Sequence, residues 1–396
     1  MDIRLAERVF YFEESQTLEM AKKARELSAQ GVRVINLSLG EPDFATPQYI
    51  SDAAKNAIDA GFTKYAPVAG FLDLRQAISD KFKRDNNLNY AANQIVVSTG
   101  AKHSLMNVIL ALINPGDEVI IPNPYWVSYS EMVKLASGIP VFIPSNVSAN
   151  YKASASAIEA AITPKTKMFL FSSPCNPSGS VFSREELNEI ANVFAKYPNI
   201  YIVSDEIYEH INFVSKHESI GQFEAIANRV ITVNGVAKAF AMTGWRIGYM
   251  GAPEFIAKAC EKIQGQFTSG ANSIAQRAAL EALTGPMTST KTMTAEYLSR
   301  RNLVLKRLEE FKEVKTNIPE GAFYVFPDFS YYIGKTLKGK EIRSTRDLCY
   351  YLLQEAHVSM VSGEAFGNPE CIRISYSLNN EDLNYAFDNI KAALNP

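Results

Sequence analysis

The stretch Val233–Gly248, which reads VNGVAKAFAMTGWRIG, places a single lysine, Lys238, directly after an apolar run typical of a buried strand. An ammonium group among Val236, Ala237, Ala239 and Phe240 would be costly to desolvate. Burial lowers the pKa of a lysine, so its neutral amine becomes available as a nucleophile. A surface lysine on a loop would give the same short pattern, so the upstream residues have to decide between the two interpretations.

Composition favours a large protein without a strongly charged surface. The chain has 396 residues, 47% of them apolar, and a formal net charge of −2, so it can build a large core and should divide into two domains. Nucleic acid is not expected as a partner, because phosphate backbones require a clustered cationic face. Residues 1–16 lack the apolar centre of a signal peptide, and no apolar run is long enough for a membrane span, so no membrane partner is expected.

Cysteines and histidines predict neither a disulfide framework nor a metal site. The cysteines show no CxxC spacing and no histidine pairing, which fits a reducing, cytoplasmic location. The histidines are too dispersed to suggest a metal cluster, and each is interpreted as structural. The residues concerned are Cys175, Cys260, Cys349, Cys371, His103, His210, His217 and His357.

Short apolar, β-branched runs alternate with helical stretches from about residue 94 to residue 250. This alternation is typical of βαβ units and predicts a largely parallel sheet. Helices are expected over residues 102–113 and 185–195. The seven expected strands are residues 94–98, 118–121, 140–143, 168–171, 200–203, 230–233 and 247–250.

The pattern changes after Gly285 and Pro286, where a smaller α+β region is expected. A long amphipathic helix over residues 290–311 leads into it. The helix over residues 18–30 and the apolar run 34–37 precede the sheet, so they could pack against this C-terminal region. Its other expected elements are strands 321–326 and 371–376 and helices 346–356 and 381–394.

Small and aromatic residues follow two of the expected strands, on the side where ligands collect in parallel α/β sheets. Gly100 and Ala101 open a helix after strand 94–98, and exposed N–H groups at a helix start bind phosphate. Trp126 lies on the loop after strand 118–121, where it could stack on a flat ring or bury itself in the core.

An amide, a carboxylate and the amine of Lys238 follow three further strands. Asn176 lies on a proline-containing turn. Asp205 directly follows an apolar run, so it needs either a core arginine or a ligand cation as a partner. Arg246, eight positions after Lys238, is a permanent cation suited to phosphate. Pyridoxal phosphate uses this combination, because its aldehyde reacts with a lysine, its ring nitrogen needs a carboxylate and its phosphate needs a cradle.

With these residues the chain resembles the fold-type I, class I aminotransferases that depend on pyridoxal 5'-phosphate, most closely the bacterial aspartate aminotransferases. The resemblance runs from LSLGEPDF at residues 37–44, through DEIY at 205–208 and the opening stretch, to CIRISY at 371–376. It implies a three-layer α/β large domain of the PLP-transferase type, with a mostly parallel seven-stranded sheet, plus a smaller α+β domain. The implied large domain spans residues 46–286, and the small domain combines residues 1–45 and 287–396.

The resemblance also implies roles for the residues around the cofactor ring. Lys238 would be the Schiff-base lysine and proton carrier, and Asp205 the partner of the pyridine nitrogen. Asn176 and Tyr208 would hydrogen-bond the phenolic oxygen of the ring, while Trp126 would stack on the ring.

For the phosphate, the resemblance implies a cradle formed by the amides of Gly100 and Ala101 together with Arg246. Tyr65 would reach the phosphate from a second subunit, which implies a homodimer with its active sites at the subunit interface. Gly235 and Ala237 stand where many members carry a hydroxyl, so this chain lacks one possible phosphate donor and relies more on Arg246 and Tyr65.

For the substrate, Arg373 would bind the α-carboxylate, assisted by the Gly40 backbone and Asn176. Lys102 and Thr17 match the residues that contact the distal carboxylate in this subgroup, although Lys102 could equally be a solvated lysine of a first helical turn. No arginine for the distal carboxylate is identified, so a preference for dicarboxylates depends on Lys102 and Thr17.

The implied activity is transfer of the amino group of aspartate, or a related amino acid, to 2-oxoglutarate by a ping-pong mechanism. Aromatic, prephenate, alanine and kynurenine aminotransferases and some β-lyases share the scaffold and remain alternatives. A more distant alternative is a non-catalytic regulator that binds pyridoxal phosphate. A nicotinamide enzyme is disfavoured, because no GxGxxG follows a first strand.

Overall fold

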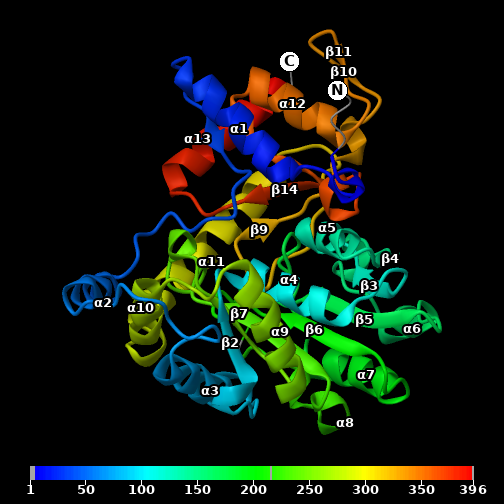
Figure 1. Cartoon of the computed structure of the whole chain (residues 1–396). Coiled ribbons are helices and arrows are strands. Elements are labelled where there is room, and N and C mark those ends of the chain that lie inside the picture. The colour runs from blue at the N-terminus through cyan, green and yellow to red at the C-terminus, as the bar shows by residue number, and fades with distance from the viewer. Residues whose placement is uncertain (1–4, 215, 395–396) are drawn as a thin grey trace.

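A seven-stranded sheet forms the centre of the structure, a computed structural model that describes residues 5–214 and 216–394 (Figure 1). Its strands follow the spatial order β2-β8-β7-β6-β5-β3-β4. Six strands are mutually parallel, and only β8 runs antiparallel to its neighbours. The strands are β2 (Ile95–Ser98), β3 (Glu118–Pro122), β4 (Ile139–Ile143), β5 (Thr166–Ser172), β6 (Tyr201–Asp205), β7 (Val230–Gly235) and β8 (Gly248–Gly251).

The expected mostly parallel sheet is therefore confirmed, with strand ends that differ from the predicted ones by a few residues. The exception, β8, has a local cause. A parallel return needs a long crossover, usually through a helix, whereas the connection from β7 to β8 contains only the short 3-10 turn Thr243–Trp245. The chain therefore comes back beside β7 in the opposite direction.

Helices cover both faces of the sheet and produce three layers (Figure 1). Successive residues of β5 point to opposite faces: Met168 and Leu170 pack into one core, whereas Phe169 and Phe171 pack into the other. The first core includes residues of α4 (Ala101–Leu112), α5 (Ser128–Leu135) and α9 (Glu254–Phe267), and the second includes residues of α6 (Ala155–Ala160), α7 (Arg184–Ala195) and α8 (Glu224–Ala227).

A third core is built around Val97, Phe82 and Tyr249 at the β2 end of the sheet. It joins three helices that flank the sheet in Figure 1: α2 (Gln48–Asp59), α3 (Leu72–Asn86) and α10 (Ser273–Thr284).

The beginning and the end of the chain pack together, as the sequence allowed. Strand β1 (Ile35–Asn36) pairs in parallel with β12 (Val358–Ser359), and α1 (Gln16–Ala29) packs against the same region. The other elements here are α11 (Thr288–Leu308), β9 (Tyr324–Val325), β10 (Thr336–Leu337), β11 (Lys340–Glu341), α12 (Thr345–Glu355), β13 (Val361–Ser362), β14 (Ile372–Ser375) and α13 (Asn380–Leu394).

Two features of this region bear on the sequence predictions. The expected strand 321–326 is reduced to β9, because Ala322 and Phe323 form a turn in which Ala322 takes a positive φ of 58°. The apolar core of the region also includes Tyr208 and Ile211, which follow β6. Because the packing is continuous across the two parts, the domain boundaries at residues 45/46 and 286/287 stay a prediction.

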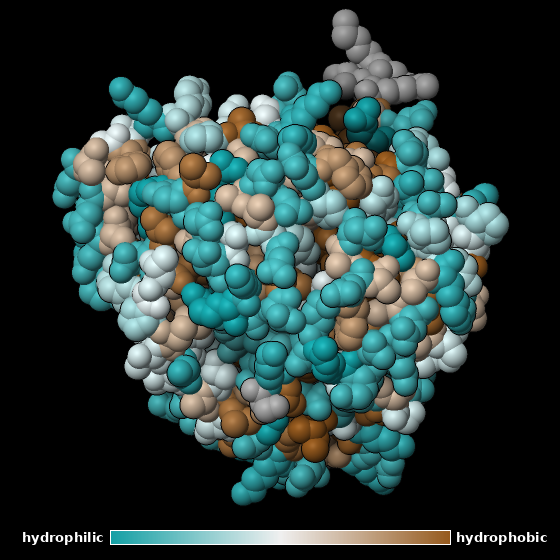
Figure 2. Space-filling model, turned by 90° about the horizontal axis from the view of Figure 1, so that it is seen from below, coloured by the Kyte–Doolittle hydropathy of each residue, from teal (hydrophilic) through white to brown (hydrophobic). Residues whose placement is uncertain are grey.

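The surface matches the balanced composition. Hydrophilic residues cover most of the face shown in Figure 2, and apolar residues form small groups between them. Among the described residues, no helix combines the length and the apolar character that crossing a membrane requires. All four cysteines are buried and unpaired, as the absence of CxxC spacing predicted.

Candidate active site

A cavity of about 420 Å³ lies beyond the carboxyl ends of the sheet strands and collects residues from the whole length of the chain. All but one of the predicted site residues line it, although they come from many separate elements. These residues are Thr17, Gly40, Gly100, Ala101, Lys102, Trp126, Asn176, Asp205, Tyr208, Lys238, Arg246 and Arg373.

One wall of the cavity is an anion cradle at the start of α4. Gly100, with φ at 86°, turns the chain from β2 into the helix, and a Cβ there would lie 2.6 Å from a nitrogen of Arg246. A Cβ at Gly248 would lie 2.1 Å from the backbone nitrogen of Ala101, so β8 can approach the helix start only with glycine. A guanidinium beside exposed helical N–H groups favours a phosphate-sized anion.

Lys238 extends from the loop after β7 into the middle of the cavity. Its Nζ donates a hydrogen bond to the Gly40 carbonyl and lies 5.6 Å from the ring centre of Tyr208. Burial, together with the positive charges of Arg373 and Arg246, lowers the pKa of Lys238 to about 8, although the carboxylates of Glu41 and Asp205 oppose the shift. The sequence-based expectation of an amine that loses its proton near neutral pH agrees with this environment.

Asp205 ends β6 and presents its carboxylate to the same cavity. Burial raises its pKa to about 6, although a hydrogen bond from the Tyr129 hydroxyl, at 2.7 Å, and one from the backbone N–H of Ile207, at 3.2 Å, favour the ionised form. A carboxylate that is desolvated and yet hydrogen-bonded is suited to pair with a ligand cation.

Aromatic side chains border the space between these groups. Trp126 packs edge-on against Tyr129, and the Lys102 ammonium lies 4.8 Å from the centre of the Trp126 ring. Tyr208 shares a 2.7 Å hydrogen bond with the Tyr324 hydroxyl. Trp126 lines the cavity and also packs partly against the core on that face of the sheet, so stacking on a flat ring stays a prediction.

Arg373 is a buried guanidinium held with its planar end in the cavity. It donates to Asn176 Oδ1 at 3.0 Å and to the Ser38 carbonyl, and it packs over the rings of Tyr324 and Phe366. Its Nε has no partner among the described residues. A buried guanidinium with spare donor capacity is suited to two parallel hydrogen bonds with a carboxylate.

Lys102 and Thr17 both line the cavity, although α4 and α1 are far apart in sequence. The Lys102 side chain stays exposed to solvent, as a lysine of a first helical turn would, but partial desolvation of its ammonium and the charge of Arg246 lower its pKa. The Thr17 hydroxyl is buried and makes no hydrogen bond to a described residue.

Tyr65 is the one predicted site residue that the fold does not bring to the cavity. Its side chain is 96% exposed, and it does not line the cavity of its own chain. This position is compatible with the predicted role across a subunit interface, which stays a prediction.

Sequence reasoning missed two tyrosines that contact the predicted residues. Tyr129 binds Asp205, and Tyr324 binds Tyr208. Tyr129 lies three residues after Trp126 at the start of a helix, a spacing that places both on one face and could have revealed it. Tyr324 lay within an expected strand but had no local signal, because its partner comes from another part of the chain.

A half-buried amine, a buried carboxylate, an anion cradle and a guanidinium with spare donors at one sheet edge define an α/β enzyme that works on small anionic substrates. The chain matches the family described as "Aminotransferase class I and II" over residues 32–390. The chain therefore belongs to the class I and II aminotransferase family, and the predicted aminotransferase activity and fold are confirmed.

Relatives from plants and bacteria match nearly the whole chain. The bifunctional aspartate aminotransferase and glutamate/aspartate-prephenate aminotransferase of Petunia hybrida is 45% identical over 401 residues, which cover 100% of this chain and 83% of that protein. The aspartate/prephenate aminotransferase of Cereibacter sphaeroides is 47% identical over 381 residues, which cover 96% of this chain and 95% of that protein.

Solved structures agree with this relationship. The aspartate aminotransferase of Rhizobium meliloti superposes with a TM-score of 0.95 at 41% identity, covering 99% of this chain and 98% of that chain. The Thermus thermophilus aspartate aminotransferase with maleate gives a TM-score of 0.93 at 38% identity, covering 99% of this chain and 100% of that chain.

Proposed function

We propose that this aminotransferase uses pyridoxal 5'-phosphate to move the amino group of aspartate to 2-oxoglutarate. The observation that carries the proposal is the half-buried Lys238 amine, with its pKa lowered to about 8, in one cavity with Asp205 and the anion cradle. Relatives at 45% and 47% identity are named for aspartate and prephenate, which supports the choice of a dicarboxylate substrate.

The residues of the cavity fit this cofactor. Gly100, Ala101 and Arg246 would hold its phosphate, Asp205 its ring nitrogen, and Tyr208 and Asn176 its phenolic oxygen, with Trp126 against the ring face. When bound, pyridoxal phosphate supplies an aldehyde that condenses with amines and a ring that accepts the electron pair released at the substrate Cα.

The side chains of the protein then perform binding and proton transfer. Arg373 holds the α-carboxylate through its guanidinium and orients the Cα–H bond toward Lys238. The neutral Lys238 amine would take the proton from the substrate Cα and deliver it to the aldehyde carbon of the cofactor. Its lowered pKa makes it a base near neutral pH. The ionised Asp205, kept in place by Tyr129, stabilises positive charge at the ring nitrogen.

Lys102 and Thr17 would bind the distal carboxylate of the substrate, because they supply to the cavity an ammonium and a hydroxyl that makes no hydrogen bond to a described residue. Prephenate, a bulky dicarboxylate, is supported as a second amino acceptor by the names of the relatives at 45% and 47% identity.

We further propose that the protein is a cytoplasmic homodimer in which the partner subunit's Tyr65 completes the phosphate cradle. The 96% exposure of Tyr65 leaves its side chain accessible to a partner subunit, which supports the dimer. The four buried, unpaired cysteine thiols support the cytoplasmic location. Sedimentation at micromolar concentration tests the dimer, and a monomer with full activity would contradict it.

Reduction with borohydride followed by peptide mass spectrometry tests the central claim. We expect the cofactor adduct on the peptide that contains Lys238, and a visible absorption change when aspartate is added before reduction. An adduct on another lysine, or none, would refute the proposal. Comparison of prephenate with 2-oxoglutarate as acceptors tests the second substrate, and a rate that is lost with prephenate would reject it.

A further inference from the structure

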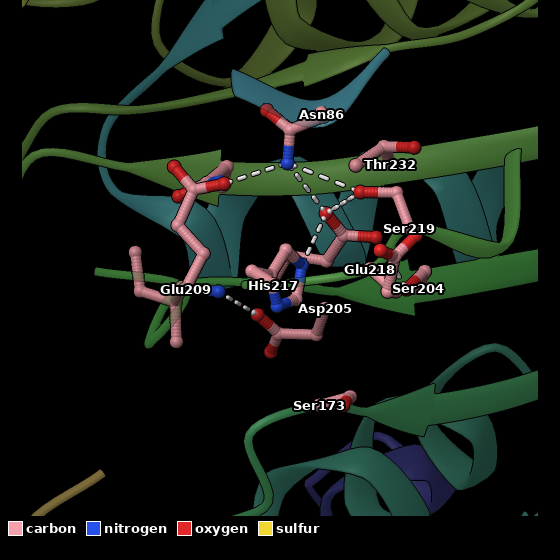
Figure 3. A network of polar contacts seen from close by, with 12 residues as sticks. Asn86, Ser173, Ser204, Asp205, Glu209, His217, Glu218, Ser219 and Thr232 are labelled. Atoms are coloured by element: carbon pink, nitrogen blue, oxygen red, sulfur yellow. Dashed lines mark hydrogen bonds and ion pairs between the residues drawn. The ribbon is translucent and has the colours of Figure 1, made fainter. Parts of the chain in front are cut away.

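A cluster of four ionisable side chains lies in the interior beside the active-site cavity, and the reaction described above does not use it. Lys81 pairs with Glu209, and His217 pairs with Glu206 at 3.0 Å; the side chains are between 1% and 7% exposed. Figure 3 shows Glu209, His217 and Ser219 gathered around Asn86, with Asp205 close by.

The cluster is closed by hydrogen bonds. The Asn86 amide donates to Glu209 at 2.7 Å and to Glu206 at 3.1 Å, while its oxygen accepts a 2.6 Å hydrogen bond from Lys81. Ser219 and Ser204 each donate to Glu206, at 2.6 and 2.9 Å. Both carboxylates therefore have several donors in the interior.

Charges within the cluster are balanced. Burial opposes ionisation of Glu209, but the ammonium of Lys81 and the adjacent His210 outweigh it and hold the pKa of Glu209 well below its usual range. Burial also disfavours a charged His217, but the carboxylate of Glu206 raises the pKa of His217 overall. Atoms of Glu206, Glu209 and His217 lie within 4.8 Å of one another, as metal ligands would, but the lysine already supplies the cation.

The cluster is linked to the active site by chain order. Asp205, which faces the cavity, is followed directly by Glu206, and Tyr208, which also faces it, is followed directly by Glu209. The backbone N–H of Glu206 still donates to Val233 on β7, so Asp205 and Glu206 continue the strand and point to opposite sides. Asp205 and Tyr208 are thus each followed by a glutamate whose carboxylate is held by the cluster.

We propose that Glu206 and Glu209, held by His217, Lys81 and Asn86, are positioning residues that orient Asp205 and Tyr208 toward the cofactor ring. This inference rests on the proposed function, since it concerns the ring of pyridoxal phosphate. The network ties the end of α3 to the segment that leaves β6 and to residues 217–219, so the segment cannot rotate without breaking buried ion pairs. The phosphate cradle, which belongs to other elements, does not depend on it.

Glu206→Ala is the test variant, and Glu206→Gln is the conservative variant that keeps the volume and one acceptor oxygen. Ile190→Ala, on α7, is the control for a general loss of stability, because Ile190 is a buried apolar side chain that cannot take part in the hydrogen bonds and ion pairs of the network. For each protein we would measure the thermal midpoint without cofactor, the dissociation constants of pyridoxal 5'-phosphate and of inorganic phosphate, and the visible circular dichroism of the bound cofactor, which reports ring orientation.

We expect Glu206→Ala to weaken cofactor binding by at least about tenfold and to reduce the visible circular dichroism, while phosphate binding changes by less than about twofold. Glu206→Gln should recover most of the cofactor affinity. Ile190→Ala should lower the thermal midpoint and leave the ratio of the two dissociation constants unchanged.

Two outcomes would overturn the proposal: Glu206→Ala binds the cofactor with normal affinity and dichroism, or it weakens cofactor and phosphate in equal proportion, as a general structural defect would. A wild-type protein that forms no adduct at Lys238 would instead refute the proposed function, and the positioning role would fall with it. If the wild type and Glu206→Ala both bind pyridoxal 5'-phosphate with the same affinity, only the positioning role is refuted and the proposed function stands.

Discussion

Replacing Lys238 with methionine should stabilise the cofactor-free protein at pH 7, although it removes the group on which the proposed activity depends. Burial lowers the pKa of Lys238 from 10.5 to about 8. One pH unit corresponds to about 1.4 kcal/mol, so keeping this lysine charged costs the folded state about 3 kcal/mol at pH 7. Loss of the hydrogen bond to Gly40 removes about 1 kcal/mol, which leaves a net gain of about 2 kcal/mol.

The difference in the free energy of unfolding between the wild type and Lys238→Met should change with pH in one direction. Between about pH 8 and 10.5 the folded wild type holds fewer protons than the unfolded chain, because the pKa of Lys238 is lower in the folded state. The free energy of unfolding of the wild type should therefore rise through this window relative to Lys238→Met. Tyrosines and cysteines titrate in both proteins, so their contribution cancels in the difference.

Urea denaturation of the cofactor-free proteins at several pH values from 7 to 10.5 measures this difference. Lys306→Met, at an exposed position on α11, is the matched control and should leave the profile unchanged. A Lys238→Met protein that is no more stable than the wild type at pH 7, or a difference that does not vary with pH, would refute the argument that Lys238 is a desolvated amine.

Further predictions concern the groups around Lys238. Asp205→Ala should lower the steady-state rate by at least about a thousandfold, because the charge at the ring nitrogen loses its partner; near-normal turnover would contradict this role. Tyr129→Phe should raise the pKa of Asp205 above about 6, because the hydrogen bond that favours the carboxylate is lost. The acidic limb of the pH profile of kcat/KM should then move upward by about one unit, and an unchanged limb would argue against the contact. Arg373→Lys should reduce kcat/KM by about 10- to 100-fold for every amino acid tested, since an ammonium cannot form two parallel hydrogen bonds; an unchanged value would exclude Arg373 from carboxylate binding. Lys102→Ser should impair aspartate and glutamate more than apolar amino acids in a donor panel, whereas equal losses would assign Lys102 to the cofactor or to the structure.

The sheet and much of the site were predictable from local patterns. The apolar run at residues 168–171 predicts a buried strand, and the strand's alternation distributes its side chains between two cores. Asp205 and Lys238 each follow such a run, so a parallel arrangement brings both to one edge of the sheet.

Contacts between distant residues were not predictable in this way. The direction of β8 depends on the length of a connection and on the close approach of Gly248 to Ala101. The hydrogen bond of Tyr129 to Asp205 spans 76 positions, and that of Arg373 to Asn176 spans 197. The histidines were expected to be dispersed structural residues, yet folding brings His217 beside Glu206.

Local order in the chain was enough to predict, to within a few residues, where the strands of the large sheet lie and which types of group follow them, because strand formation and side-chain alternation depend on near neighbours. The proton affinities of Lys238 and Asp205 and the partners of Arg373 arose only when the chain folded. The physical reason is that desolvation and hydrogen bonding depend on the groups that surround a side chain in space, and in this protein some of those groups lie up to 335 positions away in the sequence.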